Sequence, residues 1–283
     1  SWPRAADTHA APTSDDSKTI SSYLTSTAAQ VGSFRVLWLG ERWVDPVRPF
    51  SRRIDGTPYL ITGPQGLTML DAFEGSPDEG INRLDDSVQA LAGRRVHLAG
   101  HLLAPASIRF IIVDPNDDGL MSAMRRQRDI ALEQQQTHSA IFRNLEWFPR
   151  AALIAAGGGK AIPKDPSDVT LMLSNLPSGK DVPASGESDF AAPLPRTRHT
   201  RVLLSESFNS GWSASVGSRR LEHGRTLGWI NGFDIPPDAK GRLVIRFNRD
   251  WIRWLWVLLE ALIVTITVTI ARSRRREVTG WLR

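Results

Sequence analysis

The feature that most constrains this chain is a nearly unbroken apolar run over residues 251–271. At about 1.5 Å per residue in a helix, the run spans roughly 30 Å, which is the thickness of the hydrocarbon core of a bilayer. A helix buried in a protein core is the alternative reading, but core helices of this length usually keep a polar face. The run therefore predicts one transmembrane helix near the C-terminus, with the lipid bilayer as a partner.

Four arginines follow this run directly: Arg272, Arg274, Arg275 and Arg276. Lys and Arg beside the end of a transmembrane helix are retained on the cytoplasmic side, so these residues act as a topology signal. We expect residues 272–283 to form a cytoplasmic basic tail. The predicted location is the cell membrane, with the bulk of the chain outside the cytoplasm.

Glu260 interrupts the apolar run. A carboxylate near mid-bilayer costs several kcal/mol unless it is protonated or paired. It either faces another helix or is a protonated glutamate without a partner, and both readings stay open. The chain begins at Ser1 without a charged and apolar export signal, so we expect upstream transmembrane helices of the same polypeptide to deliver it to the outside.

The charge of the chain is concentrated in the tail. The formal net charge is +5, and residues 272–283 hold five Arg and one Glu, which leaves only +1 for the rest. The nearly neutral remainder shows no basic stripe interleaved with aromatic residues, so we predict no nucleic-acid partner. The chain has no cysteine, which excludes disulfides and thiolate chemistry.

The fold class predicted from the pattern is α+β. We expect a linker over residues 1–28, with a short helix near residues 20–29, and a mixed α/β extracytoplasmic unit over residues 29–156. A connection rich in Gly, Pro and Ser follows over residues 157–198, with one strand over residues 169–173. Residues 199–250 are expected to form a small antiparallel, jelly-roll-like β-sandwich that runs directly into the transmembrane helix.

Several short stretches resemble functional motifs but lack residues that those motifs require. The acidic stretch over residues 114–119 resembles the start of a calcium loop, but the twelfth position, which needs a glutamate, is Arg125. The glycines before Lys160 lack the other parts of a phosphate loop, and Ser213 lacks the second glycine of a nucleophile elbow. His97 and His101 have the i, i+4 spacing of two metal ligands, but no third ligand is evident. We predict no metal, no cofactor and no catalytic residue in this chain.

Tryptophans remain as candidate carbohydrate platforms. Trp147 and Trp212 are more typical of a core, whereas Trp229 lies in a turn between Gly228 and Gly232, and the two readings are balanced there. If the turn presents the indole to solvent, Trp229 and Asn231 together form a candidate carbohydrate-binding pair.

An ordered series of phrases resembles a known group of proteins. The phrases are Arg35-Val-Leu-Trp-Leu-Gly40, His101-Leu-Leu-Ala-Pro-Ala-Ser-Ile-Arg-Phe-Ile-Ile-Val113, Ile141-Phe-Arg-Asn144 with Phe148-Pro-Arg-Ala151, and Phe208-Asn-Ser-Gly-Trp-Ser-Ala214 with Gly228-Trp-Ile-Asn-Gly-Phe233. Together they resemble the C-terminal extracytoplasmic region of actinobacterial multi-pass membrane glycosyltransferases, of the family 2 glycosyltransferase or arabinofuranosyltransferase-like kind.

The resemblance implies a role in the assembly of cell-envelope polysaccharide or glycolipid, with catalytic residues in another part of the polypeptide. The leading hypothesis is a non-catalytic region that guides or binds envelope glycan. A membrane-anchored scaffold that recruits envelope proteins is the alternative from a different class. An independent surface enzyme is a third reading, which the failed motifs disfavour.

Overall fold

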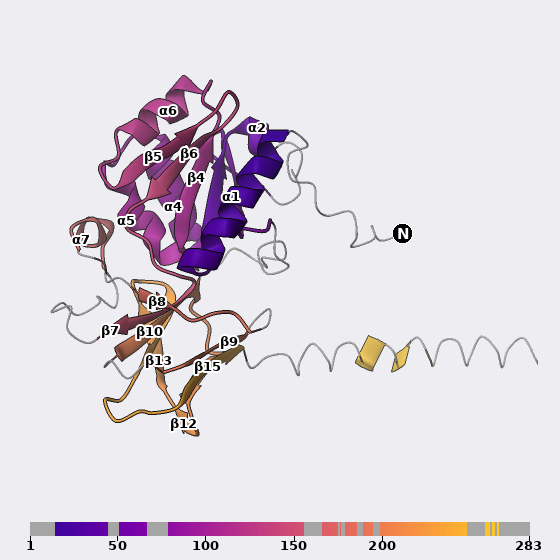
Figure 1. Ribbon diagram of the computed structural model, residues 1–283, viewed down its shortest axis with the longest axis vertical. Helices are drawn as coiled ribbons and strands as arrows, with labels where there is room; N and C mark the ends of the chain where they lie inside the picture. The colour runs from indigo at the N-terminus through magenta and orange to yellow at the C-terminus, as the bar shows by residue number, and fades with distance from the viewer. Residues whose placement is uncertain are drawn as a thin grey trace, which may run out of the picture.

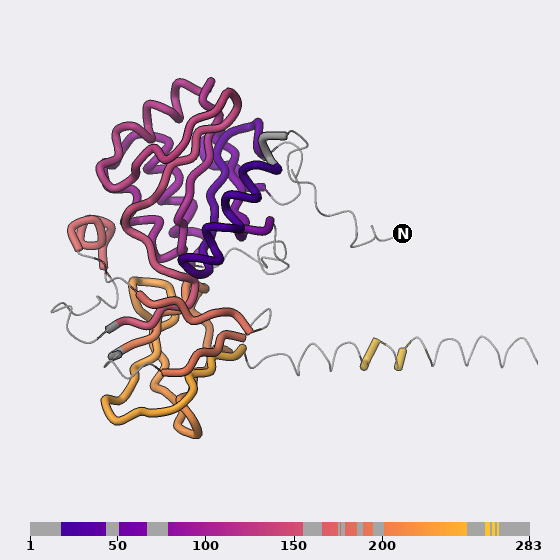
Figure 2. The backbone as a smooth tube through the Cα atoms, in the orientation of Figure 1, coloured from indigo at the N-terminus to yellow at the C-terminus, as the bar shows by residue number. Residues whose placement is uncertain are grey.

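The computed structural model describes residues 15–44, 51–66, 79–155, 166–174, 176, 179–185, 189–194, 199–247, 258–260, 262, 263 and 265. An α/β unit, which holds every element up to β6, lies next to a β-sandwich made of β7 to β15 (Figure 1). Figure 2 shows the backbone leaving the first unit where the two meet, with helix α7 (Asp168–Met172) set to one side. The prediction of an α+β fold is confirmed.

The α/β unit is built on a six-stranded sheet, here called the central sheet, in the order β2-β3-β1-β4-β6-β5. Its strands are β1 (Arg35–Leu39), β2 (Arg52–Ile54), β3 (Thr57–Thr62), β4 (Ile108–Val113), β5 (Ile130–Gln135) and β6 (Ala140–Asn144). β1 and β4 are parallel, and the other pairs are antiparallel. The apolar runs of β1 and β4 suit the middle of the sheet, because strands there are buried on both faces.

Helices cover both faces of the central sheet. α1 (Asp15–Val31) packs Ile20 and Leu24 against one face. The opposite face is covered by α4 (Glu79–Ala92), α5 (Ala99–Leu103) and α6 (Asp118–Arg125). Apolar residues at helical spacing, such as Val88 and Leu91 of α4, explain this packing. Two short helices, α2 (Glu41–Val44) and the 3-10 helix η2 (Ala104–Ala106), complete the unit.

The β-sandwich has two antiparallel sheets. The inner sheet, in the order β13-β14-β10-β7-β8, lies nearer the α/β unit, and the outer sheet has the order β12-β11-β15-β9. The strands of the inner sheet are β7 (Ala151–Ala155), β8 (Gly179–Asp181), β10 (His199–Ser207), β13 (Glu222–Thr226) and β14 (Ile230–Asp234). Those of the outer sheet are β9 (Asp189–Pro193), β11 (Trp212–Val216), β12 (Arg219–Arg220) and β15 (Arg242–Phe247).

The inner sheet is buried on both faces. On β10, Val202 and Leu204 point into the core between the two sheets, whereas Leu203 joins the core of the α/β unit. β7 divides in the same way, with Leu153 on one side and Ile154 on the other. One layer of strands therefore belongs to two hydrophobic cores, and the two units pack as one body.

Three segments differ from what the sequence predicted. Residues 15–28, expected in a linker with only a short helix near residues 20–29, form most of the longer helix α1, because a buried pair at i, i+4 spacing holds it on the central sheet. β7, β8 and β9 come from residues assigned to the α/β unit and the connection, yet they pair within the sandwich. Residues 169–173, expected as a strand, lie in and just after helix α7, whose first turn is capped by the Ser167 hydroxyl.

Most of the predicted transmembrane segment, residues 251–271, lies outside the described residues. The same holds for the predicted cytoplasmic tail and its four arginines, Arg272, Arg274, Arg275 and Arg276. Within the part of the chain that the structure describes, no helix has both the length and the apolarity needed to cross a membrane. The membrane anchor therefore stays a prediction from the sequence.

Candidate functional site

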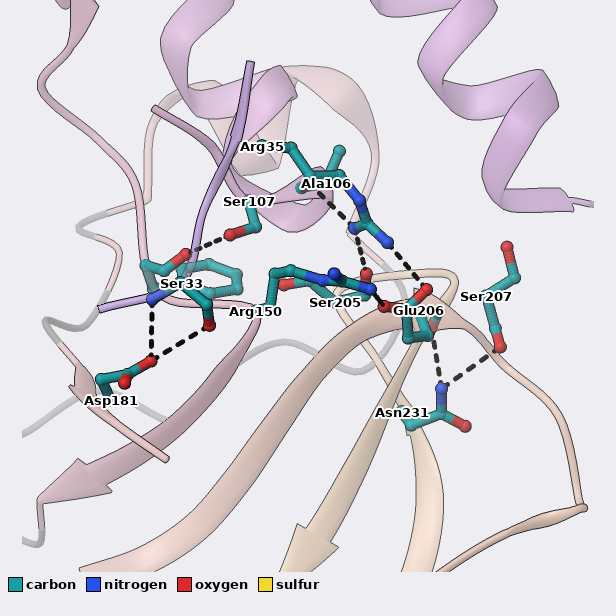
Figure 3. Close-up of polar contacts among 11 residues, drawn as sticks. Ser33, Arg35, Ala106, Ser107, Arg150, Asp181, Ser205, Glu206, Ser207 and Asn231 are labelled. Carbon is teal, nitrogen blue, oxygen red and sulfur yellow. Dashed lines mark hydrogen bonds and ion pairs between the residues drawn. The ribbon is translucent and has the colours of Figure 1, made fainter. Parts of the chain in front are cut away.

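A buried charged cluster lies where the two units meet, and it joins three side chains. Arg35 opens β1, Glu206 lies near the end of β10, and Arg150 precedes β7 (Figure 3). Arg35 Nη2 is 2.8 Å from Glu206 Oε2, and Arg150 Nη2 is 2.6 Å from Glu206 Oε1. The three side chains are only 11, 17 and 12 % exposed for Arg35, Glu206 and Arg150. One carboxylate thus binds a guanidinium on each of its oxygens, and we call this set the ion triad.

Further hydrogen bonds extend the ion triad across the interface between the α/β unit and the sandwich. Arg35 Nη1 donates to the carbonyl oxygen of Ser205 at 2.5 Å and to that of Ala106 at 3.2 Å. Close by, the amide and the hydroxyl of Ser33 both donate to Asp181 Oδ1 at 3.2 Å. The bond to Ser205 and the two bonds of Ser33 connect β1 and the residues just before it with β10 and β8 of the sandwich, and the bond to Ala106 ties Arg35 to η2 within the α/β unit (Figure 3).

The pKa values of the two carboxylates at this interface follow from their burial and their hydrogen-bond and charge partners. Burial alone would raise the pKa of Glu206, but the neighbouring Arg35 and Arg150 outweigh it and hold the pKa below its ordinary value. Glu206 is therefore ionised at neutral pH, and both of its oxygens are occupied. Burial raises the pKa of Asp181, and the Ser33 hydrogen bonds offset only part of that rise. An ionised carboxylate shared by two arginines suits a structural clamp better than a general acid or base.

A small cavity of about 50 Å³ lies beside the ion triad. Its wall includes Arg35, Glu206, Ser207, Gly80 and Trp229. A volume of this size has room for a few water molecules, whereas sites for small-molecule ligands typically measure about 300–1,000 Å³. The cavity is too small to enclose a sugar ring.

Trp229, one of the two predicted carbohydrate-binding residues, lies in the wall of this cavity and not on the surface. The residue is 8 % exposed and belongs to the core of the α/β unit. A Cβ atom on Gly80 of α4 would lie 2.5 Å from the indole Cε3, so α4 packs directly on the ring and needs a glycine there. Of the two readings that the sequence left balanced, the structure shows the buried one, because α4 covers the indole. Carbohydrate binding itself stays untested.

Asn231, the other predicted carbohydrate-binding residue, is fully buried. Its Nδ2 donates to the carbonyl oxygens of Glu206 and Ser207, at 2.7 and 3.2 Å. Its Oδ1 accepts from the amide of Asn209 at 3.2 Å and lies 2.9 Å from Nε2 of His223. The side-chain amide therefore uses its hydrogen-bonding groups within the fold, where it fixes the strand that carries Glu206.

A second buried pair joins a histidine of α5 to a carboxylate just before β5. Nδ1 of His101, in α5, is 2.7 Å from Oδ2 of Asp129, and the same oxygen accepts the backbone amide of His101 at 2.9 Å. Nε2 of His101 lies 3.9 Å from Oε2 of Glu146. Burial alone would lower the pKa of His101, but the hydrogen bond and charge of Asp129 outweigh it, and the pKa is raised.

The raised pKa of His101 predicts a pH-dependent stability. A histidine whose pKa is higher in the folded state contributes stability that is complete below the unfolded value of about 6.5 and is lost as the pH rises through the folded value. We expect His101→Gln to destabilise the chain by roughly 1–3 kcal/mol in mildly acidic solution, and by less at alkaline pH.

The measurement is urea unfolding of the parent and of His101→Gln between about pH 5.5 and about pH 8.5. Taking the difference between the two proteins removes the contribution of His223, whose pKa burial lowers. A difference that stays constant or grows with pH contradicts this assignment.

The structure also places the other residues that the sequence singled out. Trp212 is in the core between the sheets, and Trp147 is partly buried, with the Arg109 guanidinium 4.2 Å from its ring centre. Residues 114–117 form a turn, and Asp117 caps α6 by accepting from the amide of Leu120. His97 precedes α5, so it does not share a helical face with His101. Among the described residues, no group of side chains has the arrangement of a metal site.

The sequence predicted the environment of these groups poorly. Arg35, Arg150, Glu206 and Asp129 were not among the predicted site residues. The available signal was an arginine inside the apolar run of residues 34–39, because a charge on a central strand needs a buried partner.

Comparisons with known proteins give one partial similarity. No protein-family model matches the chain, and no curated protein matches it. Three solved structures of the arabinofuranosyltransferase AftD from Mycobacteria match 40 % of this chain and 7 % of that chain, with 17–18 % identity and a TM-score of 0.24. The chain thus corresponds to a small part of that protein's length. A likeness at this level does not define function, and the chain has a weak and partial structural similarity to an arabinofuranosyltransferase.

Proposed function

We propose that this chain is the non-catalytic extracytoplasmic region of a membrane glycosyltransferase, where it guides or binds the glycan during assembly of a cell-envelope polysaccharide or glycolipid. The observation that carries the proposal is the ion triad of Arg35, Glu206 and Arg150, which holds the α/β unit against the sandwich. Together with the inner sheet shared by two cores, it gives a rigid body of two units.

A rigid body close to a membrane anchor supports a positioning role. The last strand, β15, ends at Phe247, and the predicted transmembrane helix begins at Trp251. So short a connection keeps the sandwich near the bilayer. The contacts between the two units then fix the position of the α/β unit relative to the sandwich. Such a body holds a glycan or a neighbouring domain at a defined height above the membrane.

The proposed role in envelope assembly rests on the short sequence stretches in β1, β4, β6 and the sandwich that resemble membrane glycosyltransferases. No donor-sugar motif of those glycosyltransferases matches this sequence, so we assign the chemistry to another part of the polypeptide. The His101–Asp129 pair is the arrangement closest to a catalytic dyad among the described residues, but Asp129 also holds the first turn of α5.

The test uses the full chain in lipid nanodiscs, incubated with nucleotide-sugar and lipid-linked sugar donors together with envelope oligosaccharide acceptors. We expect no sugar transfer, while titration with the same oligosaccharides detects binding. Transfer by the parent that disappears in His101→Gln would make the chain an enzyme and contradict the proposal. Absence of both transfer and binding would favour the scaffold described next.

A scaffold that recruits envelope proteins is the second candidate, and helix α7 favours it. Val169 and Leu173 lie four residues apart, at the i, i+4 spacing that places them on one side of the helix. They are 60 and 76 % exposed, an unusual exposure for large apolar side chains. A partner protein that covers these two residues would explain it.

A further inference from the structure

The outer sheet has one apolar face and one charged face. Leu243 and Ile245 of β15 point inward, into the core between the two sheets. Because side chains alternate along a strand, Arg242, Val244 and Arg246 point outward. Ser215 of β11 lies opposite Val244 on one side and opposite Arg220 on the other, so Arg220 shares the outward face.

This outward face carries more positive than negative charge. Arg220, Arg242 and Arg246 are all exposed. Asp189 of β9 lies opposite Arg246, but its Oδ2 is 3.9 Å from Arg246 Nε, and the Arg246 and Asp189 side chains are 69 and 44 % exposed, so this pair is weak. Residues 199–250 as a whole contain eight Lys or Arg and five Asp or Glu, a net charge of +3. We call the three arginines the basic face.

The basic face belongs to the strand closest in sequence to the predicted membrane anchor. Only three residues separate Phe247, at the end of β15, from Trp251. A fully extended chain covers at most about 3.6 Å per residue, so these two residues lie within roughly 15 Å of each other. Arg246 is one residue further back, so the same bound places it within roughly 18 Å of Trp251.

We propose that the basic face binds anionic lipid headgroups and so orients the whole body on the membrane surface. The inference rests on the membrane anchoring in the proposed function. Each Lys or Arg near an anionic bilayer strengthens attraction about fivefold, and the effect falls off within a Debye length. The three arginines lie on β12 and β15, on either side of β11, and together they favour a docked orientation on the order of 100-fold.

The test measures how close the outer sheet lies to the lipid. Because the chain has no cysteine, Ser218→Cys in the exposed turn before β12 gives a single attachment site for a fluorophore. The full chain is placed in nanodiscs of phosphatidylcholine, with or without about one third phosphatidylglycerol, that contain an acceptor-labelled lipid. Energy transfer is expected to rise with phosphatidylglycerol and to fall at about 1 M salt, where the Debye length is about 3 Å.

Two triple variants separate the basic face from general charge. In the chain with Arg220→Ser, Arg242→Ser and Arg246→Ser, we expect the ratio of docked to undocked protein to fall on the order of 100-fold. The matched control replaces Arg125, Arg126 and Arg128, three exposed arginines at the end of α6 and just beyond it, with serine. The control removes the same charge and is expected to leave the response to phosphatidylglycerol unchanged.

The outcomes are distinct. Equal responses of the two triple variants, or no response of the parent to phosphatidylglycerol, overturn the inference while leaving the proposed function in place. Failure of the chain to incorporate into any nanodisc removes the anchoring, and with it both proposals. A response of the parent to soluble dextran sulfate alone would assign the basic face to a polyanionic glycan and also overturn the inference.

Discussion

Glu206→Gln is expected to lower the free energy of unfolding by about 3–5 kcal/mol, because it leaves Arg35 and Arg150 buried without their shared counter-charge. Removing one member of a buried ion group is far more costly than removing a surface pair, since the remaining charges stay out of water. The measurement is urea unfolding of the parent and the variant, followed by tryptophan fluorescence. The variant is expected to reach its midpoint at a lower urea concentration.

The control is Asp189→Asn, which removes a carboxylate from the weak surface pair with Arg246. Its effect is expected to stay below about 1 kcal/mol. The lowered pKa of Glu206 adds a pH signature, since stability from a carboxylate with a depressed pKa is present above its unfolded value of about 4.3 and is lost as the pH falls through the folded value. Equal costs for the two variants would mean that the ion triad is not the clamp between the units.

Trp229→Ala is expected to cost about 3–5 kcal/mol, because it empties the space under α4 where the indole packs between the two units. Deleting a buried aromatic ring loses its transfer free energy and also leaves a cavity that the surroundings fill only in part. A surface indole that served only as a glycan platform would cost less than about 1 kcal/mol. Thermal and urea unfolding of this one variant distinguish the two roles.

The comparison is Leu132→Ala on β5, which shortens a side chain that is 47 % exposed and is expected to change stability by less than about 1 kcal/mol. Glycan titration of the parent and of Trp229→Phe, which keeps an aromatic ring in the core, completes the test. Loss of glycan binding in Trp229→Phe with unchanged stability would return the indole to a binding role.

The apolar patterns predicted much of the fold. The apolar runs over residues 34–39 and 108–113 indicate strands buried on both faces, as β1 and β4 are, and the spacing of Ile81, Leu84, Val88 and Leu91 indicates an amphipathic helix, as α4 is. The same reasoning was less successful from residue 151 to residue 194. There β7, β8 and β9 are short and separated by turn-forming residues, and long-range pairing with later strands decides their place.

The ion triad between the two units could not be predicted from the sequence for a related physical reason. Arg35 and Glu206 are 171 residues apart in the sequence, and their proximity depends on how two sheets stack. The burial of Trp229 was undecided for the same reason. Its glycine-rich turn allowed either exposure or burial, and the local sequence did not reveal that a helix some 150 residues earlier would lie over the indole.

The sharing of one sheet by two cores also limits how this chain can be divided. A fragment that ends after β6 keeps the central sheet but loses Leu203, Ile154 and Ile230, which form part of its own core. A fragment that begins at β7 exposes the same residues to solvent, and such an apolar surface promotes self-association. The α/β unit and the sandwich are therefore not independent folding units. We expect them to be expressed and degraded together.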